Sequence, residues 1–348
     1  MRRNALIAAI FALTAISGVL HYATDQSVAT FVMCAVSLAG LAWLVSLGTE
    51  ALGGHFGPAG TGVLQSTLGN LPELFVVLFA LSAGEIVVAQ TSILGSLFAN
   101  ALLVIGLSIV AGTRAAEDGC MRFGARLPND TAVLTLLAVF LIVVLGVSDR
   151  IGDRASHHEV AISVVGAVVL LLIYASWLPG YIRSDAAAVA HEQGVDLLSL
   201  RTALVLLSVA GAGAALVSDW FIAALDPAVE SLGISKAFTG LVIVGIAGNA
   251  VENTVGITLA AKGKSDLAVS VIKNSLAQIA VFLYPVLVIV SLAFSHRLTF
   301  VVNPVLTVAL VLTAIAVWAI TGDGKATAFE GWSLAGLYVI LATLVWYE

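Results

Sequence analysis

Two glutamates lie within long apolar stretches of the chain, and each closes a short motif that contains asparagine. The motifs are GNLPE at residues 69–73 and GNAVE at residues 248–252, so the carboxylates are Glu73 and Glu252. A carboxylate in the middle of a membrane span costs roughly 2.5 kcal/mol or more and usually marks an ion or proton pathway. Each glutamate follows an asparagine by three residues, which places amide and carboxylate on one face of a helix. This pair could bind a cation or exchange protons.

The composition indicates that the lipid bilayer is the main surroundings of the chain. Of its 348 residues, 60% are hydrophobic and 10% are charged, whereas about a quarter of the residues of a soluble domain are charged. We therefore expect an integral, multi-pass membrane protein with no nucleic-acid partner, and nothing indicates an oligomer. Cys34, Cys120 and the six histidines follow no ligand or redox spacing, so we expect no cofactor.

Apolar windows of about 20 residues predict an all-α protein with eleven transmembrane helices. The expected spans are 5–22, 27–47, 59–82, 86–112, 130–148, 160–180, 201–222, 238–261, 266–294, 299–320 and 332–347. Residues 1–24 are interpreted as a leading helix rather than a cleaved signal peptide. The polar stretch 183–200 divides the remainder into two halves, 25–182 and 201–348.

The distribution of lysine and arginine predicts a cytoplasmic N-terminus. With that orientation ten basic residues fall in inside loops and four in outside loops, while Lys273 lies within a span. The short loops fit a bacterial inner membrane.

The two motifs belong to an internal repeat. Glu73 and Glu252 are 179 residues apart, and the same offset superposes Gly95-Ser96-Leu97 on Asn274-Ser275-Leu276. Five spans separate equivalent positions, so the second copy crosses the membrane in the opposite direction. Inverted repeats of this kind build the central sites of many secondary transporters.

Oxygen atoms dominate the candidate site. Its predicted ion ligands are Glu73, Glu252, Asn70, Asn249, Ser96, Ser275 and Gln278. Glycine and proline beside the glutamates weaken the helices and free backbone carbonyls. Ca²⁺ binds six to eight such oxygens. Gln90 and Asn100 are expected to bond across helix interfaces instead.

The motifs at residues 48–52, 69–74 and 88–96, together with residues 248–252 and 275–280, resemble the two α-repeats of the calcium/proton exchanger (CAX) family. The resemblance implies an eleven-helix fold, with one leading helix and two inverted five-helix halves. It also implies that Glu73 and Glu252 bind Ca²⁺ and exchange it for protons. The chain departs from the family pattern at Asn253, Ala99 and Asn274, and Pro72 is closer to the wider antiporter superfamily.

Coupled exchange follows if Ca²⁺ and protons compete for the same two carboxylates, because neighbouring carboxylates in a low dielectric resist simultaneous ionisation. Na⁺/Ca²⁺ exchange and another cation/H⁺ antiport remain alternatives. A cation channel or an intramembrane carboxylate enzyme is disfavoured by the duplicated, inverted acids. Lys273 is expected to face away from Ser275, since the two lie about 200° apart on a helix.

Overall fold

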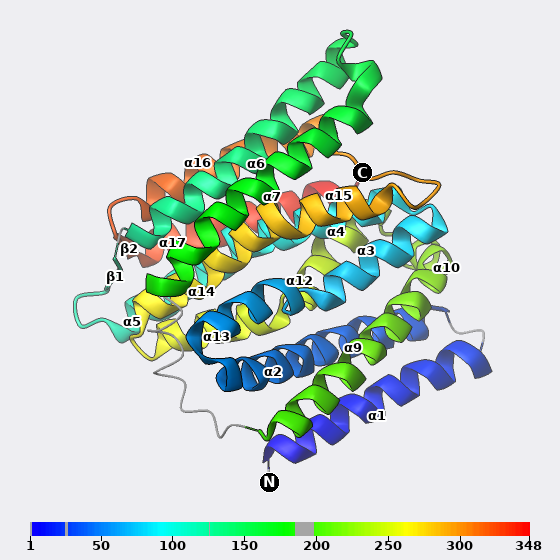
Figure 1. Ribbon diagram of the computed structural model, residues 1–348, viewed down its shortest axis with the longest axis horizontal. Helices are drawn as coiled ribbons and strands as arrows, with labels where there is room; N and C mark the ends of the chain where they lie inside the picture. Colours follow the sequence, from blue (N-terminus) through cyan, green and yellow to red (C-terminus); the bar gives the residue numbers. More distant parts are fainter. Residues whose placement is uncertain (1, 25–26, 125, 185–197) are drawn as a thin grey trace.

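The computed structural model describes residues 2–24, 27–124, 126–184 and 198–348, which are helical apart from one small sheet (Figure 1). The elements up to residue 184 are α1 (Arg2–Ala23), α2 (Ser27–Leu68), α3 (Leu71–Ala83), α4 (Ile86–Phe98), η1 (Ala99–Val104), α5 (Ile105–Ala115), β1 (Cys120–Arg122), α6 (Arg126–Ile151), η2 (Ser156–His158) and α7 (Glu159–Ser184). Those that follow are α9 (Leu200–Ala223), α10 (Leu225–Leu232), α11 (Lys236–Phe238), η3 (Thr239–Val244), α12 (Gly245–Gly248), α13 (Ala250–Ala261), α14 (Ser265–Gln278), η4 (Ile279–Leu283), α15 (Tyr284–Ser291), α16 (Pro304–Thr321), β2 (Lys325–Thr327) and α17 (Ala328–Trp346). Most of the expected central loop, residues 185–197, lies outside the described part.

Nine helices in the described part are long and apolar enough to cross a membrane, and the bent unit of α10 with α11–α12 raises the number to ten. The eleven expected spans include two that the structure interrupts, at Asn70 and at Asn249. The prediction that the second span ends near residue 47 and the third begins near residue 59 is wrong, because α2 continues without a break to Leu68. Pro72 explains the actual position of the break: proline lacks an N–H and therefore favours the first turn of a new helix.

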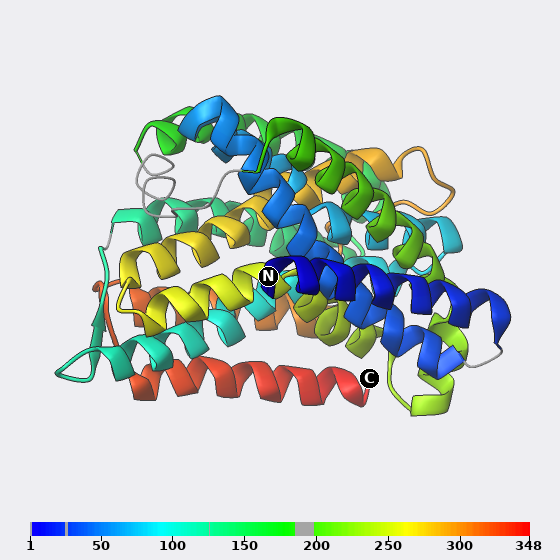
Figure 2. The ribbon, with the colours of Figure 1, turned by 90° about the horizontal axis from the view of Figure 1, so that it is seen from below.

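Two spans form the centre of the molecule. They are Ile86–Ala115 (α4, η1 and α5) and Ser265–Ser291 (α14, η4 and α15). In their most apolar windows, 89% and 78% of the residues are buried, compared with at most 50% in any other candidate span. At the periphery, α1 packs against α2 and α9, and α17 packs against α5, as Figure 2 shows. The two central spans are therefore shielded from lipid by the rest of the chain.

The two halves share local backbone features at the predicted offset. Asn70 and Asn249, which precede α3 and α13, have nearly identical backbone angles, with φ/ψ of −98°/23° and −94°/19°. The π-helical turns η1 and η4, which begin at Ala99 and Ile279, follow α4 and α14 at the same offset to within one residue. Such π-helical turns often occur at functional sites.

Glycines bring the two halves into backbone contact at the centre. A methyl group on Gly95 of α4 would overlap the carbonyl oxygen of Leu241 in η3. A methyl group on Gly245 of α12 would lie 2.5 Å from the carbonyl carbon of Gly95. Small residues permit this close crossing of membrane helices, and the crossing holds α4 against the break that precedes α13.

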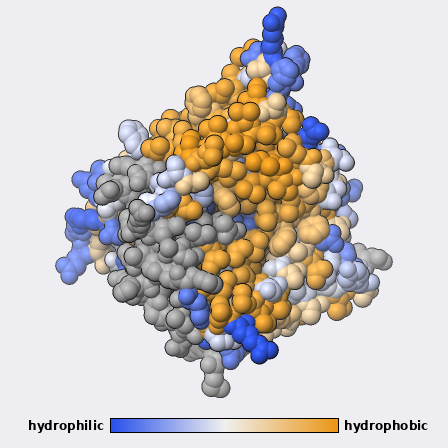
Figure 3. Space-filling model, viewed as in Figure 1, coloured by the Kyte–Doolittle hydropathy of each residue, from blue (hydrophilic) through white to orange (hydrophobic). Residues whose placement is uncertain are grey.

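The hydropathy of the surface is that expected of a protein surrounded by lipid. Figure 3 shows a broad apolar face, with hydrophilic residues gathered at the tip of the α6–α7 hairpin and at the edges. Strands β1 and β2 pair antiparallel, with Met121 opposite Ala326, and so join the α5–α6 and α16–α17 connections. Both connections therefore lie on the same side of the molecule.

The close crossing of α4 and η3 predicts that alanine substitutions at Gly95 and at Gly336 have different effects on stability. We expect Gly95→Ala to lower the free energy of unfolding by about 1–3 kcal/mol or more, since overpacking forces backbone shifts. Gly336→Ala in α17 is the control, because a methyl group there would meet no atom within 4 Å. Thermal unfolding of both variants in detergent checks this expectation, and equal unfolding temperatures would contradict it.

Candidate ion-binding site

The two glutamates occupy equivalent positions at the start of broken helices. Glu73 is the third residue of α3 and Glu252 the third residue of α13, so each carboxyl lies in a first helical turn. The positive end of a helix dipole favours negative charge there. Glu73 is 2% exposed, Glu252 is partly buried, and the two are close enough to interact electrostatically.

Glu73 lies directly against the break of the other half. A methyl group on Gly248 would stand 2.7 Å from Cγ of Glu73 and 2.8 Å from its Cδ and Oε1. The absence of a side chain at Gly248 thus makes room for the carboxyl group. Its second oxygen, Oε2, is buried and makes no hydrogen bond to the described residues, so it is available to a proton or a cation.

An asparagine network lies at the same centre. The Nδ2 amide of Asn100 donates to Oδ1 of Asn249 at 3.0 Å and to Oγ of Ser275 at 3.2 Å. Asn249 in turn donates to the carbonyl oxygen of Gly245 at 3.0 Å. This network links the two central spans to the helix break that precedes Glu252.

Several oxygens of the cluster lack hydrogen-bond partners in the described part of the chain. They are Oε2 of Glu73, Oδ1 of Asn100 and Oγ of Ser96. A buried polar atom without a partner costs about 1–3 kcal/mol, and such an atom in a native structure often marks an ion or catalytic site. The arrangement has the chemistry of an oxygen site for a hard cation, with two acids that can also take protons.

The other predicted ligands lie on the same elements without being joined to this network. Asn70 is 5% exposed at the break before α3, and Ser96 is fully buried on α4. Gln278 is 8% exposed at the end of α14, and no hydrogen bond links it to the described residues. Their role as ion ligands stays a prediction.

Asn100 is part of the cluster, although the sequence indicated only a bond across a helix interface for it. Gln90 donates to the carbonyl oxygen of Val301 at 2.9 Å, so it bonds to the connection between α15 and α16 rather than to a helix. This bond is compatible with the expected place of Gln90 outside the site, but the predicted bond across a helix interface is wrong. Asn100 bonds across helices, but its partners Asn249 and Ser275 are themselves predicted ligands. The available signal was its spacing, since Asn100 follows Ser96 by one helical turn and so shares its face.

Lys273 points away from this cluster, as predicted. Its Nζ donates to Oγ1 of Thr321 on α16 at 2.7 Å. The next residue, Asn274, donates to Oγ of Ser270 at 3.3 Å. The lysine charge is therefore directed to the opposite face of α14 from Ser275.

Known proteins share both the sequence pattern and the fold. The sodium/calcium exchanger protein family model matches residues 26–179 and 202–347. The chain is 31% identical over 350 residues to a Ca²⁺/H⁺ antiporter of Synechocystis, covering 94% of this chain and 93% of that protein. It is 32% identical over 345 residues to the Ca²⁺/H⁺ antiporter ChaA of Bacillus subtilis, covering 97% and 96%. The crystal structure of the Ca²⁺/H⁺ antiporter protein YfkE superposes with a TM-score of 0.80 at 28% identity, covering 99% of this chain and 98% of the other.

The asparagine network predicts separate effects on stability and on ion binding. We expect Asn100→Leu to lower the free energy of unfolding by about 1–3 kcal/mol, because Asn249 and Ser275 lose a buried donor. We also expect it to weaken equilibrium ⁴⁵Ca²⁺ binding by about tenfold or more, as the loss of groups that orient metal ligands does.

Gln90→Leu provides the matched control, because the same chemical change there removes one hydrogen bond to the connection between α15 and α16. It should reduce stability and leave Ca²⁺ affinity unchanged. Equal Ca²⁺ affinities in the two variants would exclude Asn100 from the site.

Proposed function

Since this chain belongs to the sodium/calcium exchanger protein family, we propose that it exchanges Ca²⁺ for H⁺ across a membrane by competition of the two ions for Glu73 and Glu252. The chain is an integral, multi-pass transporter and not an enzyme. Relatives that match over nearly their whole length, from Synechocystis and Bacillus subtilis, are Ca²⁺/H⁺ antiporters. Their likeness supports the assignment of both the transported ion and the counter-ion.

One observation supports the two glutamates above all others. Glu73 of the first half lies against Gly248, in the break of the second half, and its Oε2 is buried with no hydrogen bond to the described residues. Glu252 lies in the first turn of the helix after that same break. An ion between these carboxylates would be held by both halves at once, and this is the geometry that alternating access requires.

Competition between the ions couples their transport. With neither ion bound, two ionised carboxylates would repel each other in a low dielectric. One Ca²⁺ or protons can remove that charge, but both cannot occupy the same oxygens. We propose that only a neutralised site can change the side to which it opens, so that inward proton flow expels Ca²⁺. The remaining proposed ligands are Asn70, Asn249, Ser96, Ser275 and Gln278.

The change of access is assigned to the outer helices of the site. Helices α2 and α9 pack tightly together, and a methyl group on Gly48 of α2 would lie 3.1 Å from Cβ of Leu207 on α9. We propose that the first two spans of each half move as a unit against the buried α4 and α14. Rigid-body motion of one bundle against another is the usual basis of alternating access.

We further propose that residues 25–182 and 201–348 form the two inverted halves, that residues 1–24 form a leading helix, and that residues 183–200 form a cytoplasmic connection. The matched segments 26–179 and 202–347 agree with such a division. The excess of lysine and arginine on one side supports a cytoplasmic N-terminus. The proposed location is the inner membrane of a bacterium.

Transport in proteoliposomes tests this proposal. We expect an imposed pH gradient to drive ⁴⁵Ca²⁺ uptake by the wild-type protein, and Glu73→Gln and Glu252→Gln to reduce uptake to background. Each substitution keeps the size of the side chain and removes the charge that Ca²⁺ requires. The control is Asp219→Asn, which neutralises an exposed acid of α9 and should preserve uptake.

The gradients distinguish the alternatives. Uptake driven only by a Na⁺ gradient would be compatible with the proposed site but would identify Na⁺ instead of H⁺ as the counter-ion. Uptake that needs no gradient of either ion would indicate a channel. Full activity in Glu252→Gln would exclude the proposed carboxylate pair.

A further inference from the structure

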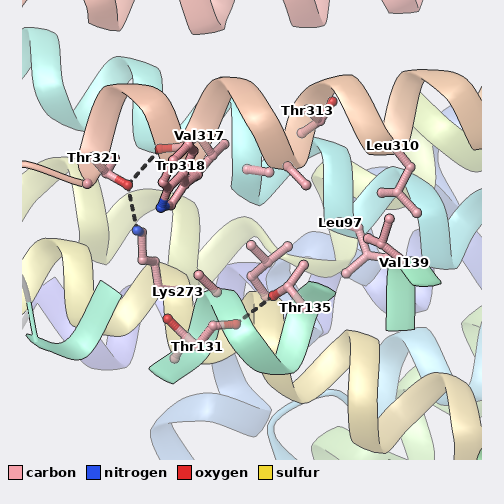
Figure 4. Close-up of a pocket in the computed structure, with 15 residues that line it drawn as sticks. Leu97, Thr131, Thr135, Val139, Lys273, Leu310, Thr313, Val317, Trp318 and Thr321 are labelled. Atoms are coloured by element: carbon pink, nitrogen blue, oxygen red, sulfur yellow. Dashed lines mark hydrogen bonds between the residues drawn. The ribbon is translucent and has the colours of Figure 1, made fainter. Parts of the chain in front are cut away.

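A pocket opens between α6, α14 and α16, with Leu97 of α4 also in its wall (Figure 4). It lies on the side of α14 to which Lys273 points, away from Ser275. Its cavity volume is about 50 Å³, and the pocket is continuous with the surroundings of the molecule. Most of its wall is apolar, for example Leu97, Val139 and Leu310. The exception is one end, where the ammonium group of Lys273 lies beside Thr321; Thr131 and Thr135 also line the pocket.

Lys273 is a buried cation without a counter-charge in the described part of the chain. Its side chain is 4% exposed, and its Nζ makes one hydrogen bond, to Thr321. The hydroxyl of Thr321 is itself used as a donor to the carbonyl oxygen of Val317 at 2.7 Å. No ion pair joins Lys273 to a described carboxylate. Two of the three ammonium N–H donors are thus left over, although a buried charge normally requires a partner.

The polar end of the pocket lies near the end of its surrounding helices. Thr321 is the last residue of α16, and β2 begins four residues later at Lys325. Trp318, one turn earlier, lines the pocket and is 65% exposed. Tryptophan at the end of a membrane helix is typical of the depth of lipid headgroups. The apolar part extends from there along α16 to Leu310, which is toward the membrane interior.

We propose that this pocket binds the anionic phosphate headgroup of a membrane phospholipid, with Lys273 as the charge partner and the acyl chain in the apolar groove. The phosphate charge complements the unpaired ammonium, and the apolar lining of the pocket suits a hydrocarbon chain. In the proposed orientation the polar end faces the cytoplasmic leaflet, where anionic lipids attract basic groups. The site is separate from the glutamates, so it does not depend on the transport mechanism.

Native mass spectrometry of the purified protein in detergent tests this site directly. The protein is titrated with phosphatidylglycerol and, in parallel, with phosphatidylcholine of the same chain length. We expect one phosphatidylglycerol molecule to bind the wild-type protein at least about fivefold more tightly than Lys273→Met. This difference in affinity corresponds to the attraction that one lysine supplies at a membrane surface. Phosphatidylcholine should not distinguish the two proteins.

Three variants separate the charge, the groove and the surface. Lys325→Met removes an exposed lysine on the same side and should bind phosphatidylglycerol like the wild type, and Lys273→Arg should also retain binding. Ala314→Phe keeps Lys273 and fills the apolar groove, so it should lose the bound lipid even if Lys273→Met fails to fold. Equal phosphatidylglycerol binding by the wild type, Lys273→Met and Ala314→Phe would overturn the proposal. Displacement of the lipid by millimolar inorganic phosphate would show that the pocket binds free phosphate and not a lipid.

Discussion

The burial of two carboxylates in the middle of a membrane protein is the constraint on which the rest of the structure depends. A membrane interior disfavours even one such charge, and the pair also repels itself. Both carboxylates are stabilised by their place in a first helical turn, and Gly248 leaves room for Glu73. These features leave the pair dependent on an external positive charge, which Ca²⁺ or protons would supply in the proposed mechanism.

The architecture follows from bringing two halves of opposite orientation to this point. Each half contributes a break, a glutamate and a long buried span with a π-helical turn. Gly95 and Gly245 allow the backbones to touch where the halves cross. That contact leaves no room for a side chain at either glycine, so α4 and the η3–α12 segment meet backbone to backbone. In the proposed mechanism this crossing is the boundary between α4 and the moving second span of the second half.

The sequence predicted the class of fold and the central pair because both depend on strong local signals. Long apolar windows predict spans, and the offset of 179 residues relates Glu73 to Glu252 without any knowledge of tertiary contacts. The continuous helix α2 was missed, since a glycine-rich stretch does not have to end a helix that its neighbours support. The place of Asn100 in the cluster was also missed, because its bonds to Asn249 and Ser275 join residues almost 150 and 175 positions away. The pocket around Lys273 is formed by residues from α4, η1, α6, α14 and α16 and could not be predicted from periodicity.

The proposed mechanism rests on the claim that Ca²⁺ and protons compete for the same two carboxylates. The most direct measurement is the dissociation constant of Ca²⁺ for the purified protein as a function of pH, at constant ionic strength. Because each bound Ca²⁺ displaces the protons of both carboxyl groups, we expect the affinity to fall on acidification, with a slope approaching about two logarithmic units per pH unit. An affinity independent of pH would contradict the claim.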